Sequence, residues 1–144
     1  MKRFNILTIL LTAIIGFTAT TAGAADATHK VVIQVSSADA GTQNLALNNA
    51  ANILKDLGPG NVQVEIVAYG PGLSMLTVKG KTAKRVKNMA FNEDLQFSAC
   101  NNTMNAVMKK TGHKPVLTKG VKVVPAGVVR IMELQEKGYS YIRP

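Results

Sequence analysis

From Lys30 onward, short apolar runs alternate with segments whose apolar residues recur at helical spacing. The run at residues 31–35 is almost wholly β-branched, which is the pattern of a strand buried on both faces of a parallel sheet. Asp39 or Thr42 can cap the helical segment that follows, and Gly58-Pro59-Gly60 ends it. This alternation constrains the fold more than any other feature of the chain.

The same pattern continues to the end of the sequence. Strands are predicted over residues 31–35, 62–69, 95–99, 121–124 and 139–142. Helices are predicted from the Asp39 or Thr42 cap to residue 57, over residues 73–89 with a break near Gly80, and over residues 101–111 and 125–137. Five strands with four intervening helices predict one α/β domain, with a mainly parallel five-stranded sheet covered by helices on both faces.

The N-terminus has the pattern of a secretory signal peptide. Lys2 and Arg3 precede an apolar stretch at residues 6–17, and Ala22-Gly23-Ala24-Ala25 offers small residues for cleavage. The apolar stretch is shorter than the ~20 residues that span a bilayer. We expect cleavage after Ala24, or one residue later, which assigns residues 1–24 to the signal peptide and residues 25–144 to the domain. The protein is therefore predicted to be periplasmic or secreted.

The chain is basic, with a formal net charge of +9. In an exported protein this charge favours anionic small molecules, acidic proteins or a phospholipid surface as partners over nucleic acid. The absence of tryptophan also argues against a platform for base stacking. The densest cluster is Lys79, Lys81, Lys84, Arg85 and Lys87, which is interpreted as a solvated face.

Cys100 is the only cysteine, so no intramolecular disulfide can form. It lies between the strand predicted at residues 95–99 and a helix whose first residues, Asn101, Asn102 and Thr103, favour helix starts. The positive end of a helix dipole and its free N–H groups stabilise a thiolate. Position alone leaves two interpretations equally open, a reactive thiol and a buried inert one.

Gly70-Pro71-Gly72 follows the second predicted strand, as Cys100 follows the third. Ligands gather at the carboxyl ends of parallel strands, so the two loops would face one crevice if these strands are neighbours. The glycine loop matches neither the P-loop nor the dinucleotide fingerprint. A tight turn that needs glycine is the favoured interpretation, and a phosphate cradle is the alternative.

Met104 and Met108 follow Cys100 at steps of four residues, so the three side chains share a helix face. Soft sulfur ligands suit Cu(I), although methionine at this spacing more often fills a core. The two histidines, His29 and His113, have no zinc-type spacing with Cys100. No cofactor and no resident metal are predicted.

Three stretches of the chain resemble the DsrE/DsrF-like family of sulfur carriers, which has the YchN-like fold. They are residues 31–57 with Leu45-Ala46-Leu47-Asn48-Asn49, Phe97-Ser98-Ala99-Cys100-Asn101-Asn102-Thr103-Met104, and the tail at residues 123–144. The resemblance implies a three-layer α/β/α sandwich that assembles into homotrimers or homohexamers. It also implies that Cys100 corresponds to the cysteine that carries persulfide sulfur between partners.

The leading hypothesis is a periplasmic sulfur carrier, sulfurtransferase-like, that binds sulfane sulfur as a persulfide on Cys100. Its partners would be sulfur donor and acceptor proteins or small sulfur compounds. Gly70, Gly72, Asn101 and Asn102 are predicted to line the site. The alternatives are a non-catalytic oligomeric binding module with a packed cysteine, and Cu(I) binding.

Overall fold

The computed structural model describes residues 27–144, so the predicted signal peptide lies outside the described residues. Within this range the strands are β1 (His29–Val35), β2 (Val62–Ala68), β3 (Leu95–Cys100), β4 (Val121–Val124) and β5 (Ser140–Ile142). The helices in the same range are α1 (Ala40–Leu57), the 3-10 helix η1 (Gly70–Leu76), α2 (Ala83–Met89), α3 (Asn101–Thr111) and α4 (Gly127–Glu136).

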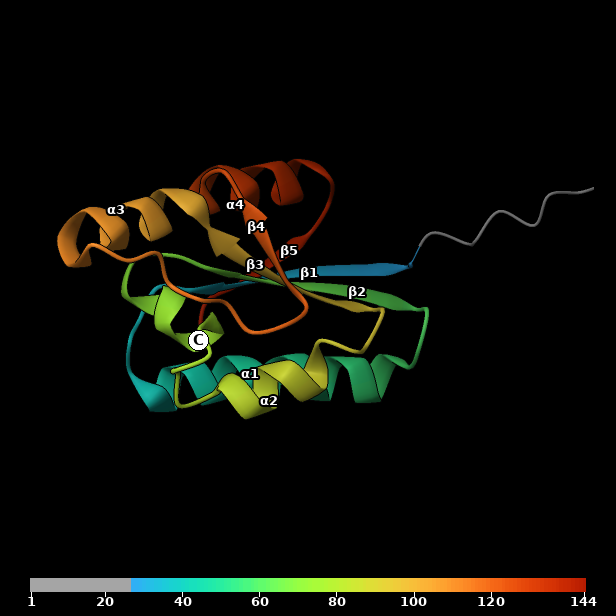
Figure 1. The fold of residues 1–144 in the computed structure, drawn as a ribbon. Helices are drawn as coiled ribbons and strands as arrows, with labels where there is room; N and C mark the ends of the chain where they lie inside the picture. The colour runs from blue at the N-terminus through green and yellow to red at the C-terminus, as the bar shows by residue number, and fades with distance from the viewer. Residues whose placement is uncertain (1–26) are drawn as a thin grey trace, which may run out of the picture.

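The strands form one sheet in the order β4-β3-β2-β1-β5, and every neighbouring pair is parallel. Figure 1 shows α1 and α2 on one side of this sheet and α3 and α4 on the other. The prediction of a three-layer α/β/α domain with a five-stranded sheet is confirmed. Because β2 and β3 are neighbours, Gly70 and Cys100 lie at the same edge of the sheet, where both strands end.

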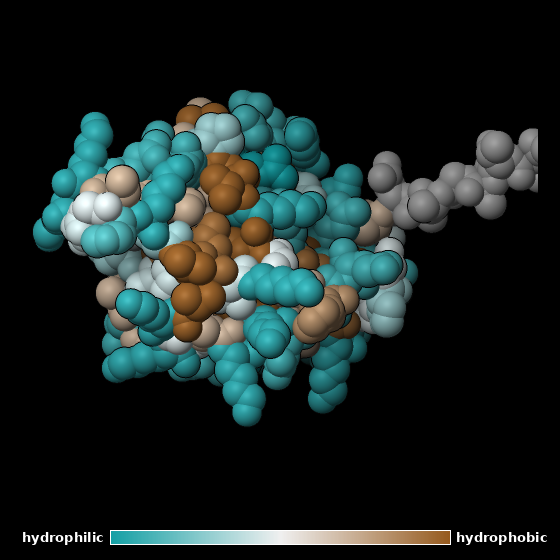
Figure 2. Space-filling model, in the orientation of Figure 1, coloured by the Kyte–Doolittle hydropathy of each residue, from teal (hydrophilic) through white to brown (hydrophobic). Residues whose placement is uncertain are grey.

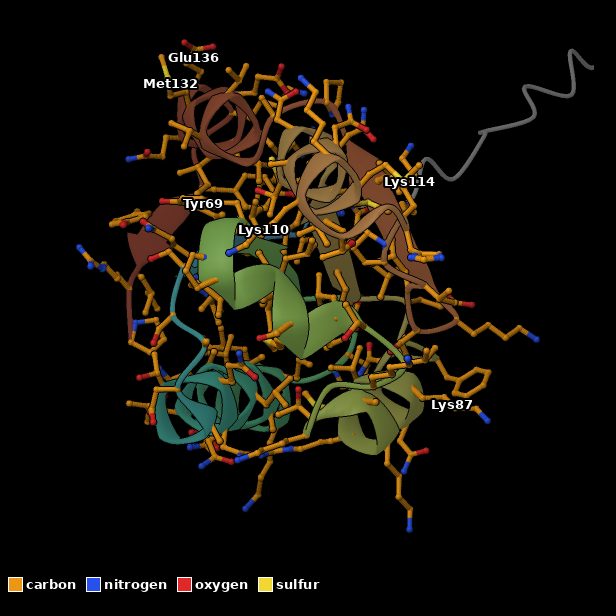
Figure 3. The ribbon with its side chains drawn as sticks, turned by 60° about the vertical axis from the view of Figure 1, so that its left-hand side comes forward. Tyr69, Lys87, Lys110, Lys114, Met132 and Glu136 are labelled. Atoms are coloured by element: carbon orange, nitrogen blue, oxygen red, sulfur yellow. The ribbon has the colours of Figure 1, made fainter. Side chains whose placement is uncertain are left out.

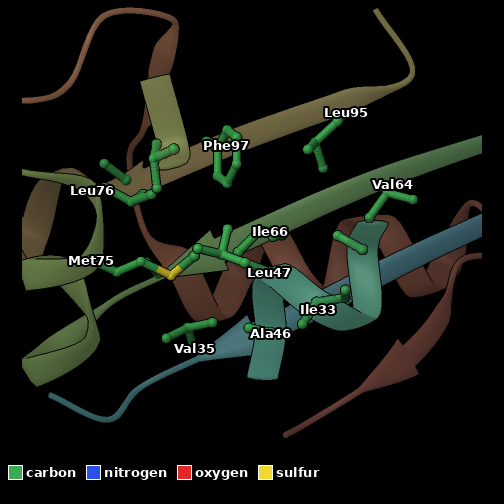
Figure 4. Packing of buried hydrophobic residues seen from close by; sticks show 14 of the residues in the cluster. Ile33, Val35, Ala46, Leu47, Val64, Ile66, Met75, Leu76, Leu95 and Phe97 are labelled. Atoms are coloured by element: carbon green, nitrogen blue, oxygen red, sulfur yellow. The ribbon is translucent and has the colours of Figure 1, made fainter. Parts of the chain in front are cut away.

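The main core lies between the sheet and the layer formed by α1, η1 and α2. Alternate residues of the central strands point to this side, among them Ile33, Ile66 and Phe97. Leu47 of α1 and Met75 of η1 pack against them, as Figure 4 shows.

The opposite face of the sheet has a much smaller apolar cluster. It consists of Val32, Val67, Ile131 and Leu134, with Tyr69 and Tyr139 packed against it. Ile131 and Leu134 lie on the side of α4 that faces the sheet, which follows from their helical spacing with buried Gly127.

Local signals explain most element boundaries. The cap of α1 is Asp39 and not Thr42, because the Asp39 carboxylate accepts the Thr42 N–H at 2.7 Å. The helix predicted at residues 73–89 is split into η1 and α2. A side chain at Gly80 would put its Cβ 2.2 Å from the Ser74 carbonyl oxygen, so the chain folds back on itself at the break. None of the helices in the described part of the chain is long and apolar enough to cross a membrane.

Candidate functional site

Cys100 is the last residue of β3 and also the N-cap of α3. Its backbone is extended (φ −71°, ψ 116°) and the helix begins at Asn101, because an apolar strand meets a run of helix-starting residues here. Only 5% of the surface of Cys100 is exposed. The thiol is therefore almost fully buried, and it lies beside the backbone N–H groups at the start of α3.

Hydrogen bonds favour the charged form of this thiol. Burial raises the pKa of Cys100, but hydrogen bonds from the Thr103 hydroxyl and from backbone N–H groups of Gly127, Thr103 and Asn102 lower it by more. The net pKa therefore lies below the ordinary value of a cysteine. Such a group is a thiolate over a wider pH range than an unperturbed thiol, and the thiolate is the nucleophile.

The Thr103 hydroxyl connects Cys100 to the glycine loop. Its Oγ1 accepts the Gly70 N–H at 2.9 Å, which leaves the hydroxyl proton free to point at the Cys100 sulfur. Gly70 has a positive φ of 53°, a conformation that favours glycine. Gly70 therefore acts on the thiol through Thr103.

The start of α4 closes over the thiol from the other side. A Cβ on Gly127 would lie 3.3 Å from the Cys100 Cβ and 3.0 Å from the Tyr69 Cβ, so a larger residue here would push against both side chains. Tyr69, labelled in Figure 3, follows β2 on the side of the sheet that α4 covers. The Asn102 N–H also reaches the Pro125 carbonyl oxygen at 3.2 Å, which joins the two helix starts.

An ion pair between buried Glu65 and partly exposed Arg130 anchors α4 one turn after Gly127. Glu65, in the middle of β2, is 3% exposed and accepts two hydrogen bonds from Arg130, at 2.8 Å from Nε and 2.7 Å from Nη2. Ser98 donates a third at 2.6 Å. The pKa of Arg130 is raised, mainly by its hydrogen bond to Glu65. Ser98 precedes Cys100 by two residues, so this network lies on the same face of β3 as the thiol.

The geometry can be compared with known proteins. The model of the DsrE/DsrF-like family matches residues 29–144. The chain belongs to the DsrE/DsrF-like family. A solved structure from Methanobacterium thermoautotrophicum, MTH1491, described as a protein of unknown function, is 31% identical in sequence and superposes with a TM-score of 0.71. The match covers 81% of this chain and 99% of that one.

MTH1491 has the YchN-like fold, so this match establishes the fold of the present family member and leaves its activity open. No functionally curated protein matches the chain. Family membership gives a sulfur-transfer-related role, and the structure adds a single buried cysteine.

The residues predicted to line the site take different positions. Asn101 is half-buried and Asn102 exposed, and the Asn102 backbone N–H is the part that reaches Cys100. Gly72 is buried, and a Cβ there would lie 2.2 Å from the Val35 carbonyl oxygen. The close approach of two backbone segments explains Gly72, whereas the permissive backbone that the tight-turn interpretation requires is seen at Gly70, whose φ is positive.

Metal-binding features are weak in this family member. Within residues 27–144, no group of three or more His, Cys, Asp and Glu side chains could hold a metal ion. Met104 packs into the main core, whereas Met108 is exposed. The core-filling interpretation therefore holds for Met104, the methionine nearest Cys100 in sequence.

The Glu65–Arg130–Ser98 network is absent from the sequence predictions. One signal for it exists, a glutamate inside the apolar run at residues 62–69. A carboxylate at a buried strand position requires a partner, but nothing local in the sequence identifies Arg130 as that partner.

Proposed function

We propose that this protein is a sulfur carrier that holds sulfane sulfur as a persulfide on Cys100. The observation that supports the proposal most is the lowered pKa of a single thiol surrounded by N–H groups at a helix start. Family membership supplies the sulfur-related context. The thiolate is the form that attacks sulfur, so the site favours the first step of such a reaction.

The chemistry requires no external oxidant. The Cys100 thiolate attacks a sulfane sulfur of a polysulfide or of a persulfide donor. The new S–S bond at Cys100 replaces the donor S–S bond, and the donor leaves as a thiolate or a shortened polysulfide. In the second step an acceptor thiolate attacks the outer sulfur, and Cys100 leaves as a thiolate that the same hydrogen bonds stabilise.

The proposed setting is the periplasm or the exterior of the cell. The signal-peptide pattern of residues 1–24 supports this localisation. The lone cysteine also fits the proposal, because a carrier needs one sulfur nucleophile and an external partner.

We also propose that the protein works as a homotrimer or homohexamer. On α4, Val128, Val129 and Met132 are exposed, immediately after the glycine that contacts Cys100. An exposed apolar strip of this kind is typical of a subunit contact. Native mass spectrometry of the protein and of a Met132→Asp variant tests this. A monomeric wild-type protein would contradict the proposal.

Intact-protein mass spectrometry tests the carrier proposal. After exposure to inorganic polysulfide, the wild-type protein is expected to gain sulfur, and a small thiol acceptor is expected to remove it. The Cys100→Ser variant is the control and should gain none. If the wild type gains no more sulfur than this variant, the protein is not a persulfide carrier.

The burial of Cys100 favours a second candidate, an oligomeric binding module in which the thiol is only packed. This candidate predicts that native Cys100 resists alkylation until the protein unfolds. Rapid alkylation of the native protein at neutral pH would contradict it.

A further inference from the structure

Basic residues dominate two long stretches of the chain. Residues 66–92 and 95–132 contain most of the lysines of the chain and no Asp or Glu. These stretches include η1, α2, β3, α3, β4 and the loops between them, and they extend into α4. Within residues 27–144 the ion pairs are those of Arg130 with Glu65 and Glu133, so the lysines of these stretches have no carboxylate partner.

A hollow lies between the end of α3 and the segment after η1. It has a volume of about 530 Å³. Its wall includes Val107 and Thr111 of α3, Val78 and Lys79 after η1, and Lys114 and Val116 before β4. Two backbone hydrogen bonds hold the latter two segments together, from Val78 N–H to the Val116 carbonyl at 3.0 Å and from Thr118 N–H to the Leu76 carbonyl at 2.8 Å. The hollow is therefore part of the folded framework.

A second hollow of about 450 Å³ adjoins the first, because Val78 lines both. Lys84 and Lys87 of α2 and Lys119 before β4 lie around it. Figure 3 shows Lys87 and Lys114 on the same side of the molecule. We call the two hollows together the basic groove, defined by Val78 and Val116 and by Lys79, Lys84, Lys87, Lys114 and Lys119.

The basic groove combines apolar surface with positive charge. Val78 is 51% exposed and Val116 is 67% exposed, which is high for valine beside a hollow. Figure 2 shows an apolar strip on the front of the molecule, where the segment between α3 and β4 runs in Figure 1, with hydrophilic side chains around it. In the free protein the two valines stay exposed to water, and the lysines have no carboxylate partner in the described part of the chain. An apolar contact surrounded by unpaired charge is typical of a surface that binds a partner.

We propose that the basic groove binds an extended acidic segment of a partner protein, with an apolar residue of that segment against Val78 and Val116. Charge complementarity selects the carboxylates, and the lysines around the hollows would meet them on both sides of the apolar contact. Two copies of the basic groove would repel each other, which disfavours a symmetric contact between them. A lipid surface is flat and would leave the two hollows unfilled, so a chain segment fits better.

This proposal goes beyond sulfur chemistry. Cys100 precedes the first residue of α3, whereas Thr111, which lines the groove, is its last. A helix of 11 residues is about 16 Å long, so the groove and the thiol lie at opposite ends of α3. A partner bound in the groove would leave the thiol uncovered.

Fluorescence anisotropy with a defined peptide tests the proposal. The probe is a labelled peptide of glutamates around one central leucine, and the control peptide has glutamine in place of glutamate. We expect the purified protein to bind the first peptide and not the second, with weaker binding as salt rises to about 0.15 M. Failure to bind the acidic peptide at low salt would overturn the proposal.

Matched variants separate the groove from net charge. The Lys79→Gln/Lys114→Gln protein should bind the acidic peptide about tenfold more weakly. The Lys55→Gln/Lys137→Gln control removes the same charge from exposed sites on α1 and after α4, and should change affinity less than about twofold. Equal weakening by both pairs would mean non-specific attraction and would overturn the proposal. Unchanged melting curves confirm that all variants fold.

Further measurements test the apolar contact, distinguish other occupants of the groove, and separate this proposal from sulfur transfer. Val78→Ser should weaken the leucine-containing peptide several-fold and leave a glutamate-only peptide unaffected. If the wild-type protein binds phosphatidylglycerol vesicles and the Lys79→Gln/Lys114→Gln variant does not, the groove would instead be assigned to lipid. If the wild-type protein self-associates and the Lys79→Gln/Lys114→Gln variant does not, the basic groove would be assigned to contact with a second copy of the chain. Cys100→Ser should bind the peptide as the wild type does, which separates this test from that of sulfur transfer.

Discussion

The two faces of the sheet differ in how they are covered. The face under α1, η1 and α2 has a large and almost wholly apolar core, to which every central strand contributes. The face under α4 has a small apolar cluster and, beside it, Glu65, Arg130 and Cys100. The comparison indicates that one face stabilises the domain, while the other, more thinly covered, holds a charged pair and a thiol that a thick apolar core would exclude.

The largest expected effect compares the same substitution on the two faces. Leu47 on α1 and Leu134 on α4 are both buried. We expect Leu47→Ala to lower the free energy of unfolding by about 4–5 kcal/mol and Leu134→Ala by about 2–3 kcal/mol, because fewer apolar neighbours surround the second site. Urea denaturation measures both. Equal losses would contradict the distinction between the faces.

The next effect concerns the Glu65–Arg130 ion pair on the face of the sheet that α4 covers. Arg130→Leu leaves the Glu65 carboxylate buried without its partner, and should lower the free energy of unfolding by about 2–3 kcal/mol. The double variant Glu65→Leu/Arg130→Leu removes both charges and should regain much of that loss.

Glu133→Gln is the control for this pair. Its carboxylate is exposed and lies 3.6 Å from Arg130 Nη1, so the change should stay below about 0.5 kcal/mol. A double variant as unstable as the single one would show that the ion pair is not what Arg130 contributes.

A smaller effect concerns the thiol itself. Thr103→Val keeps the side-chain shape but removes the hydroxyl that lowers the pKa of Cys100. Alkylation by iodoacetamide at neutral pH should slow about five- to tenfold, because less thiolate is present. Thr111→Val at the other end of α3, where the hydroxyl bonds the Val107 carbonyl, should leave the rate unchanged. Equal alkylation rates in the two variants would show that the Thr103 hydroxyl does not stabilise the Cys100 thiolate.

Local sequence patterns predicted the elements well. α3 and β4 have the predicted bounds, since Gly112 takes a left-handed C-cap and a short β-branched run marks the strand. The choice between Asp39 and Thr42 as the cap of α1 was open in the sequence, because both residue types cap helices.

The contacts on the face that α4 covers were harder to predict, because they join segments that are distant in the sequence. Glu65 and Arg130 are 65 positions apart, and their pairing depends on where α4 crosses the sheet. The position of Cys100 at a helix start was predicted from neighbouring residues. The contributions of Gly127 and of Gly70 through Thr103 depend on three loops that meet only in the folded chain.

The pH dependence of Cys100 alkylation tests the central claim most directly. The claim is that hydrogen bonds around Cys100 stabilise its thiolate in the folded protein, so its pKa lies below that of the unfolded chain. The alkylation rate of the native protein should rise with a midpoint below the ordinary cysteine pKa of about 8.5, and the denatured protein should show the ordinary midpoint. A native midpoint at or above the denatured one, or no alkylation before unfolding, would contradict the account.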